Sequence, residues 1–282
     1  MTSRSGRVWR RLRRAVLWTL AAGALCVAYG YFVEPYWPQV THARISSARL
    51  RPRAHPIRVV LLSDMHSDPK PRLEDRLPAL VAAQSPDLIV YMGDSINSIE
   101  ALPVFHRCMT RLAQVAPTFA VRGNWDVWYW SGVDLFGGTG VRELDGDAAS
   151  VDVGGTSVWV GGVPVGHEGL ARRALGRIPE GSPALFLYHY PYPDVLPEAA
   201  QGTIDLLCTG HTHGGQVALP LYGAIVTLSK YGKTYEAGLY RTGALWMYVT
   251  RGIGLEGGAS PRVRFFARPE ITVVDIVPET AG

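Results

Sequence analysis

The chain has 282 residues, of which 47% are hydrophobic and 18% charged, and its formal net charge is +4. This composition excludes a disordered chain, which would hold fewer apolar residues and more charge. The three cysteines, Cys26, Cys108 and Cys208, do not make a disulfide framework and are expected to serve as small hydrophobic residues.

The N-terminus combines a basic segment, residues 1–14, with an apolar run, residues 15–33. The run carries no charge and is long enough to cross about 30 Å of hydrocarbon as a helix. Because this apolar run follows directly, we interpret the basic segment as the flank of a membrane-spanning helix and not as an arm that binds nucleic acid. We expect no nucleic-acid partner. The basic side chains are Arg4, Arg7, Arg10, Arg11, Arg13 and Arg14.

These arginines outnumber the basic residues close behind the run, which predicts a cytoplasmic N-terminus and an uncleaved single-pass anchor with the remaining chain across the membrane. Two alternatives stay open. Ala28-Tyr29-Gly30 has the small-x-small form of a signal-peptide cleavage site, and the paired arginines fit a loose twin-arginine export signal. The length of the run favours the anchor.

Residues 34–56 contain scattered arginines and prolines without a clear period, and they are predicted to be a linker to one domain, residues 57–278. Near-continuous apolar runs in that domain are typical of strands buried on both faces. They occupy residues 57–63, 88–92, 118–121, 158–163, 185–188 and 204–209.

Helical patterns at 73–83 and 102–115 separate several of these strands, and alternating strands and helices predict an α/β domain with parallel pairing. From Val217 onward the predicted strands are shorter, with Gly and Pro between them, and they end at 271–277. This pattern predicts a second, more antiparallel sheet.

Five polar clusters stand just past predicted strands, where α/β sheets gather side chains from distant sequence into one crevice. Residues two apart in an extended segment point the same way, so each Asp-x-His or His-x-His pair can address one site. Carboxylate, amide and imidazole groups without nearby thiolates suit hard or borderline divalent ions. The clusters are Asp64-Met65-His66, Gly93-Asp94, Gly123-Asn124-Trp125-Asp126, His189, and Gly210-His211-Thr212-His213-Gly214-Gly215.

Each cluster alone also has a plain structural interpretation. An Asp-x-His is commonly a solvated loop, a Gly-Asp is commonly a turn, and a lone His beside a strand is usually hydrogen-bonded structure. Two imidazoles flanked by glycines are harder to explain in that way. The functional interpretation therefore depends on all five clusters occurring in this order.

That order resembles the calcineurin-like metallophosphoesterase superfamily, whose pattern runs Asp-x-His, Gly-Asp, Gly-Asn-His-Glu/Asp, His and Gly-His-x-His. The resemblance covers residues 57–276. The tail from Ser260 to Ile271, which closes on Arg268-Pro269-Glu270-Ile271, resembles a bacterial membrane-anchored branch. With the arginine asymmetry, which places the domain on the extracytoplasmic side, we expect the bacterial inner membrane.

The resemblance implies a four-layer αββα sandwich with two divalent metal ions at its rim. Manganese is the expected metal, with iron, zinc or magnesium as alternatives. One ion would take Asp64, His66 and His213, the second would take Asn124, His189 and His211, and Asp94 would bridge them. Asp94, Asn124 and His211 are the implied catalytic residues. Two cations about 3.5–4 Å apart can lower the pKa of a shared water and clamp a phosphate.

One position departs from the family pattern. Trp125 stands where the family usually has a histidine that protonates the leaving oxygen, so Asp126, which would orient that ring, is expected to lack its partner. Losing a general acid costs about 10²–10⁴-fold unless the leaving group departs easily. We therefore expect a pyrophosphate or a similar substrate, as in the resembling enzymes that split UDP-2,3-diacylglucosamine. Asn124 and Trp125 are the predicted substrate contacts.

Three functions remain in competition. The first is a phosphodiesterase or pyrophosphatase for a phosphate-containing glycolipid or phospholipid near the bilayer. The second is a general extracytoplasmic phosphoesterase for soluble esters, and the third is a membrane-tethered module that binds metal with little turnover. The presence of all seven ligand positions disfavours the third. An extracytoplasmic domain disfavours a cytoplasmic UDP-sugar.

Overall fold

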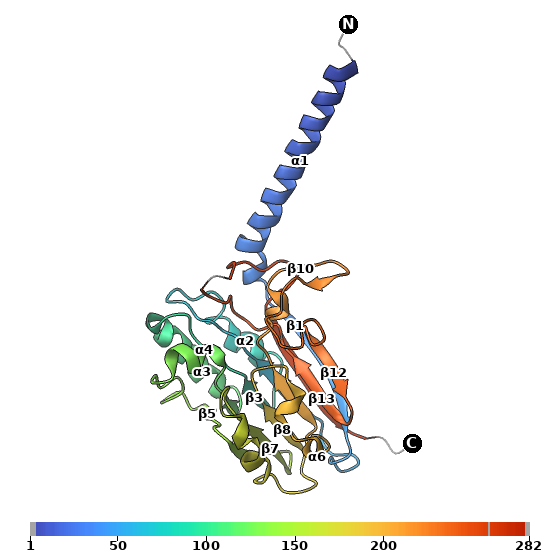
Figure 1. Cartoon of the computed structure of the whole chain (residues 1–282). Helices are drawn as coiled ribbons and strands as arrows, with labels where there is room; N and C mark the ends of the chain where they lie inside the picture. The colour runs from blue at the N-terminus through green and yellow to red at the C-terminus, as the bar shows by residue number, and fades with distance from the viewer. Residues whose placement is uncertain (1–3, 259, 280–282) are drawn as a thin grey trace.

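The structure is a computed structural model that describes residues 4–258 and 260–279. Figure 1 shows one long helix, α1 (Arg4–Phe32), projecting from one end of a layered α/β domain. Two six-stranded sheets and a separate two-stranded hairpin account for the strands of the described residues.

The first sheet has the order β1-β14-β2-β3-β4-β5, and its neighbouring strands are parallel except for the β14–β2 pair. Its strands are β1 (Gln39–Ser47), β2 (Ile57–Leu62), β3 (Leu88–Tyr91), β4 (Thr118–Ala120), β5 (Arg142–Glu143) and β14 (Glu270–Pro278).

The second sheet has the order β12-β13-β9-β8-β7-β6, with parallel pairing from β13 to β7 and antiparallel pairing at both edges. Its strands are β6 (Asp147–Val153), β7 (Thr156–Gly162), β8 (Ala184–Leu187), β9 (Leu206–Thr209), β12 (Gly238–Thr242) and β13 (Leu245–Val249). The hairpin consists of β10 (Ala218–Leu219) and β11 (Gly223–Ala224).

The alternation of side chains along each strand explains the layers. Val59 and Leu61 of β2 face the core between the two sheets, where they meet Val160 and Leu185 of the second sheet. Residues on the opposite faces pack against helices, so the central strands of each sheet are buried on both faces. The helices are α2 (Leu77–Ala82), α3 (Leu102–Ala113), α4 (Asn124–Trp130), α5 (Ala171–Leu175) and α6 (Glu198–Gln201), with single 3₁₀ turns between them.

The predicted αββα class is confirmed, and the predicted strands and helices reappear with shifted ends. Two expectations, one for most of the tail and one for the linker, are wrong. In the tail only β10 and β11 form a sheet of their own, because β12 and β13 extend the second sheet while β14 enters the first between β1 and β2. Strands β13 and β14, which are consecutive in sequence, therefore lie in different sheets.

The linker predicted at residues 34–56 contains strand β1, which pairs with β14 from Gln39↔Glu270 to Ser47↔Pro278. This strand lies at the edge of its sheet, and only Ile45 and Ser47 in it are buried. An edge strand needs no continuous apolar run, which is why composition suggested a linker. The ordered domain therefore begins before Ile57.

The basic segment and the apolar run belong to one continuous helix, α1; residues 1–3 of the basic segment lie outside the described residues. The helix is long and apolar enough to cross a membrane, and almost none of its apolar stretch is covered by the domain. Its last turns do contact the domain, since Gly30 O accepts from Arg264 N at 2.9 Å and the rings of Tyr29 and Phe265 meet edge to face.

The Arg268-Pro269-Glu270-Ile271 motif has a structural role at this junction. Arg268 donates to the carbonyls of Trp37 and Pro38, which follow α1. Glu270 is buried and accepts from the Thr41 and Tyr248 hydroxyls. The motif thus fastens the chain leaving α1 to both sheets.

Candidate metal centre

The five polar clusters come together where strands of both sheets end. Asp64 and His66 follow β2, Asp94 follows β3, and Asn124 begins α4 just past β4. From the second sheet, His189 follows β8, and His211 and His213 follow β9. The carboxyl ends of parallel strands share an edge, so the two facing sheets bring all seven side chains to one rim.

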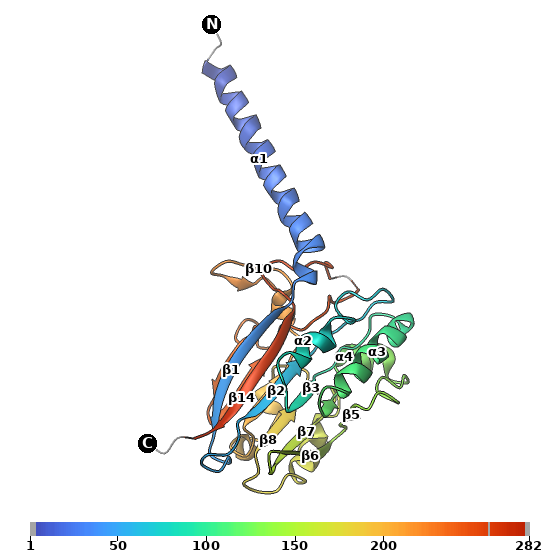
Figure 2. The same ribbon diagram turned by 180° about the vertical axis from the view of Figure 1, so that it is seen from behind.

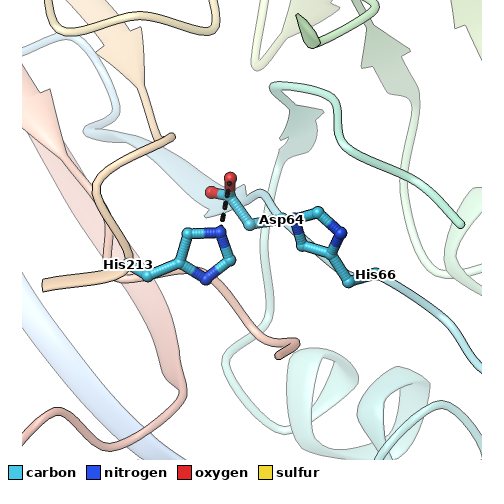
Figure 3. A group of neighbouring side chains, drawn as sticks. All are labelled: Asp64, His66 and His213. Atoms are coloured by element: carbon cyan, nitrogen blue, oxygen red, sulfur yellow. Dashed lines mark ion pairs between the residues drawn. The ribbon is translucent and has the colours of Figure 1, made fainter. Parts of the chain in front are cut away.

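Six of these side chains form two groups that could each hold a metal ion, and within each group the ligand atoms lie within 4.8 Å of one another. The first group is Asp64, His66 and His213, which Figure 3 shows converging from separate strand ends. The second group is Asp94, His189 and His211.

The two carboxylates lie between the groups. Asp94 Oδ2 is 3.3 Å from His189 Nε2 and 3.5 Å from His66 Nε2, which belong to different groups. Asp64 Oδ1 is 3.4 Å from His213 Nε2 and 3.9 Å from His189 Nε2. An aspartate that touches both groups is the arrangement expected of a bridging ligand.

Three of the histidine rings are oriented by a hydrogen bond at one ring nitrogen, which leaves the other nitrogen for a metal ion. His189 Nδ1 is 2.6 Å from Met92 O, and His66 Nδ1 is 3.0 Å from Asn97 Oδ1. Each Nδ1–H therefore donates, which leaves the lone pair of each Nε2 free. His211 is held through its other nitrogen, since Nε2 is 3.2 Å from Leu228 O and Nδ1 remains available.

Three atoms of the predicted ligands are buried without a hydrogen-bond partner: His66 Nε2, His189 Nε2 and Asn124 Oδ1. A buried polar atom without a partner costs about 1–3 kcal/mol. All three are lone-pair donors of the kind that divalent cations take, and two of them belong to the two different groups. The residues present therefore fit a pair of divalent metal ions.

The charges of the site point the same way. Burial lowers the pKa of His66 and of His211 to about 4, so both rings are neutral at physiological pH. Burial would raise the pKa of Asp94, but His189 and His66 bring it below its ordinary value. These are the protonation states in which the groups bind metal.

Asp64 and His189 are the two members whose pKa values do not favour the metal-binding form, for different reasons. Burial raises the pKa of Asp64 to about 7. Burial acts to lower the pKa of His189, but Asp94 and Asp64 raise it to about 9. The protein alone lacks the positive charge to keep both aspartates ionised, and divalent cations would supply it.

The backbone of the site is strained. Asp64, His66, Asp94, His211 and His213 all have positive φ, between 40° and 72°, a region that non-glycine residues seldom adopt. Such residues cost about 1–3 kcal/mol each and cluster at functional sites. The sharp turns make side chains from different strand ends converge.

Two glycines allow the backbone to approach the aspartates of the site closely. A Cβ at Gly210 would overlap the Ser63 hydroxyl and the Asp64 carboxylate, and one at Gly123 would overlap Asp94. Neither glycine has a positive φ. Glycine is therefore required at both positions by the lack of space for a side chain and not by the backbone conformation.

Asp126 does not lack a partner, contrary to the expectation from sequence. Its buried carboxylate accepts from the backbone N–H groups of Asp94 (2.9 Å), Ser95 (2.8 Å) and Gly123 (3.0 Å). It joins the turns after β3 and β4, which carry Asp94 and Asn124. Its role is to hold the two turns together, whatever residue stands at position 125.

Trp125 is half-buried beside the two groups, with its ring centre 5.1 Å from that of His66. It forms part of the wall of a cavity of about 720 Å³ that also borders His211 and His213. Seven of the other residues that line it are apolar or aromatic: Trp128, Tyr129, Val217, Ile225, Val226, Leu228 and Pro261. The metal-binding groups thus open onto an apolar cavity.

Residues 57–215, more than half of the chain, match the calcineurin-like phosphoesterase family. The chain belongs to this family. It is 30% identical to the metallophosphoesterase YkuE of Bacillus subtilis, over 94% of this chain and 96% of that protein. It is also 30% identical to the phosphodiesterase YaeI of Escherichia coli, over 94% of this chain and 98% of that one.

A third relative, a zebrafish (Danio rerio) transmembrane protein with a metallophosphoesterase domain, is 28% identical over 92% of this chain and 62% of that protein. Family membership and the two ligand groups make this chain a metal-dependent phosphoester hydrolase.

Sequence reasoning missed several residues that shape the site. Asn97 orients His66, and buried Arg264 places its guanidinium 3.5 Å from His213 Nδ1 while donating to carbonyls of the surrounding loops. Neither belongs to a motif with the ligands. Their polar character was the only signal, and it does not distinguish them from surface residues.

The role of Asp126 gives the first prediction. Asp126→Ala should lower the free energy of unfolding by several kcal/mol, because three buried N–H groups lose their acceptor at about 1–3 kcal/mol each. Asp152→Ala is the matched control, since this exposed carboxylate accepts one backbone bond, from Gly155 N. Denaturant unfolding of both variants measures the difference. Equal stability of the two variants would show that Asp126 does not hold the turns.

Proposed function

We propose that this hydrolase cleaves a phosphodiester or pyrophosphate bond in a substrate that also carries an apolar group. The observation that supports the proposal is the apolar cavity that opens directly onto the two ligand groups. A phosphate alone would leave most of about 720 Å³ unfilled, whereas an acyl chain or a base would occupy it. The relative named as a phosphodiesterase supports a diester over a monoester.

In this proposal Asp64, His66 and His213 hold one divalent ion, and Asn124, His189 and His211 hold the other, with Asp94 shared. Two such ions supply positive charge that activates water and offsets the charge on the phosphate. Manganese is the expected metal, and iron, zinc and magnesium also suit oxygen and nitrogen donors.

The protein groups around the ions position the substrate. The Asn124 amide offers one lone-pair oxygen and two N–H donors, so it can bind metal and a phosphate oxygen together. Trp125 stands between the ligand groups and the cavity and provides an apolar surface for the adjoining part of the substrate. The burial of the site excludes water from the unpartnered nitrogens, which strengthens their interaction with charge.

A lipid-linked substrate fits this arrangement best. The cavity wall that includes Ile225, Val226 and Leu228 suits an acyl chain, as in a phospholipid or in a glycolipid of the UDP-2,3-diacylglucosamine type. Lipid A biosynthesis is the corresponding pathway for the second of these. A soluble ester would gain nothing from this apolar wall, which disfavours the general phosphoesterase.

The proposed location is the bacterial inner membrane, with α1 as an uncleaved anchor. Tyr29 and Gly30 contact Phe265 and Arg264, so cleavage after Gly30 would separate the helix from residues that dock it. The arginines at the start of α1 favour a cytoplasmic N-terminus and an extracytoplasmic domain. The relative named as a transmembrane protein supports the anchor.

The absence of an imidazole at position 125 gives the second prediction. Turnover of aryl and alkyl phosphodiesters should fall steeply as the leaving-group pKa rises. A positioned general acid contributes roughly 10²–10⁴-fold to the rate, and Trp125→His should raise turnover by less than that. The reason is that the oxygens of Asp126 already accept three backbone bonds and would not orient the new ring.

Trp128→His, on the same cavity wall, is the matched control and should leave the slope unchanged. The measurement is log kcat against leaving-group pKa for the three proteins. A flat line for the wild type would contradict the proposal. It would assign proton donation to another side chain of the cavity, such as Glu256, whose pKa burial raises.

The topology gives the third prediction. Protease added to intact spheroplasts should digest the domain and leave α1 in the membrane, because the arginines hold the N-terminus inside. A cytoplasmic protein is the internal control and should stay intact. If the domain is digested only after lysis, the orientation is reversed, and a cytoplasmic UDP-linked glycolipid becomes the better substrate.

A further inference from the structure

Residues 217–228, which we name the apolar hairpin, include β10 and β11 and carry no charged side chain. Ten large apolar side chains are exposed among the described residues from 39 to 279, and six of them lie in this segment. Leu221 at its tip is fully exposed. The six are Leu219, Leu221, Tyr222, Ile225, Val226 and Leu228. Such a concentration marks a contact surface, since soluble proteins seldom expose contiguous apolar patches.

The hairpin lies beside the end of α1. Its first strand is joined to the segment that docks the helix, because Ala218 N donates to Phe265 O at 2.8 Å. The ring of Phe265 in turn meets Tyr29 of α1, with ring centres 6.1 Å apart. Figures 1 and 2, which are opposite views, both show β10 level with the end of α1 and on the domain face from which the helix projects.

The docking of α1 sets the depth of this face. The apolar run ends at Val33, yet Gly30 already contacts Arg264. Three residues of helix rise about 4.5 Å, so the contacted loop reaches at least the edge of the hydrocarbon that the run would span. Phe266 in the same loop is 60% exposed. The hairpin, paired with this loop, is held at the same level.

The charges near the hairpin are balanced. Lys230 and Lys233 follow the hairpin closely in sequence, and they form ion pairs with Asp194 and Glu236. Glu236 also accepts from Ala224 N of the hairpin. Lys233 Nζ lies 4.1 Å from the centre of the Tyr222 ring and donates to Ala224 O. An apolar tip with aromatic and lysine residues behind it is the arrangement of interfacial membrane segments.

We propose that the apolar hairpin inserts into the bilayer interface beside α1 and that the cavity of the metal centre receives its substrate from the lipid. Ile225, Val226 and Leu228 belong to both the hairpin and the cavity wall. The carbonyl of Leu228 also accepts from His211 Nε2, so the hairpin extends from the membrane surface to a predicted metal ligand. This inference rests on the membrane anchor and the lipid-linked substrate proposed above.

The test measures the depth of the hairpin without depending on turnover. The full chain carries Cys26→Ala and Leu221→Cys, a nitroxide is attached at position 221, and the protein is reconstituted into vesicles of phosphatidylethanolamine and phosphatidylglycerol. Cys108 and Cys208 are buried and escape labelling in the folded protein. Ser157→Cys is the matched control, since Ser157 is exposed and belongs to β7. Figure 2 shows the strand β7 on the end of the domain away from α1.

The label at position 221 should collide with oxygen more often than with a water-soluble nickel complex, and the label at 157 should show the reverse. Equal exposure to the nickel complex at both positions would overturn the inference, and activity in that same sample would leave the proposed reaction standing. Dipolar broadening between labels at 221 would also overturn it, since the hairpin would then contact a second copy of the chain. A full chain that fails to float with the vesicles would overturn the anchor and this inference together.

Discussion

The structure depends on the burial of two aspartates and three histidines, beside a fourth, half-buried histidine, at one point where strands of two sheets end. Asp64 and Asp94 are almost inaccessible, and neither forms an ion pair with an arginine or lysine among the described residues. Burying carboxylates without compensating cations is costly, and the shifted pKa values of Asp64 and His189 express that cost within the protein. Divalent ions bound to this cluster would offset that cost.

The rest of the rim serves to impose this arrangement. Five of the predicted ligands have positive φ, a region that costs free energy for residues other than glycine. Asp126 holds two of the turns together through three buried hydrogen bonds. His66, His189 and His211 are each held through one ring nitrogen so that the other stays available. The strain and the unpartnered atoms are stable only because the two sheets behind them are fully packed.

The sequence predicts which polar side chains meet at the rim, because strand ends, glycines and His-x-His spacing are local signals. It predicts the interior strands for the same reason, since each is a short apolar run. It misses β1 because an edge strand with only two buried residues has no such run. It misassigns Asp126 because the carboxylate of Asp126 accepts hydrogen bonds from backbone N–H groups. A pattern of side chains in the sequence does not report such bonds. Arg264 and the apolar hairpin acquire their roles only through contacts made after folding, with α1 on one side and the metal centre on the other.

The dependence of the buried cluster on cations can be measured directly. Metal-free full chain titrated with Mn²⁺ should show a rising thermal midpoint that saturates at two ions per chain, because a ligand that binds only the folded state stabilises it, by about 2.7 kcal/mol at one hundred times its Kd. Asp94→Ala should lose the larger part of both the bound metal and the shift, since Asp94 touches both groups. A midpoint that does not respond to metal, or an Asp94→Ala variant with wild-type metal content, would contradict the account.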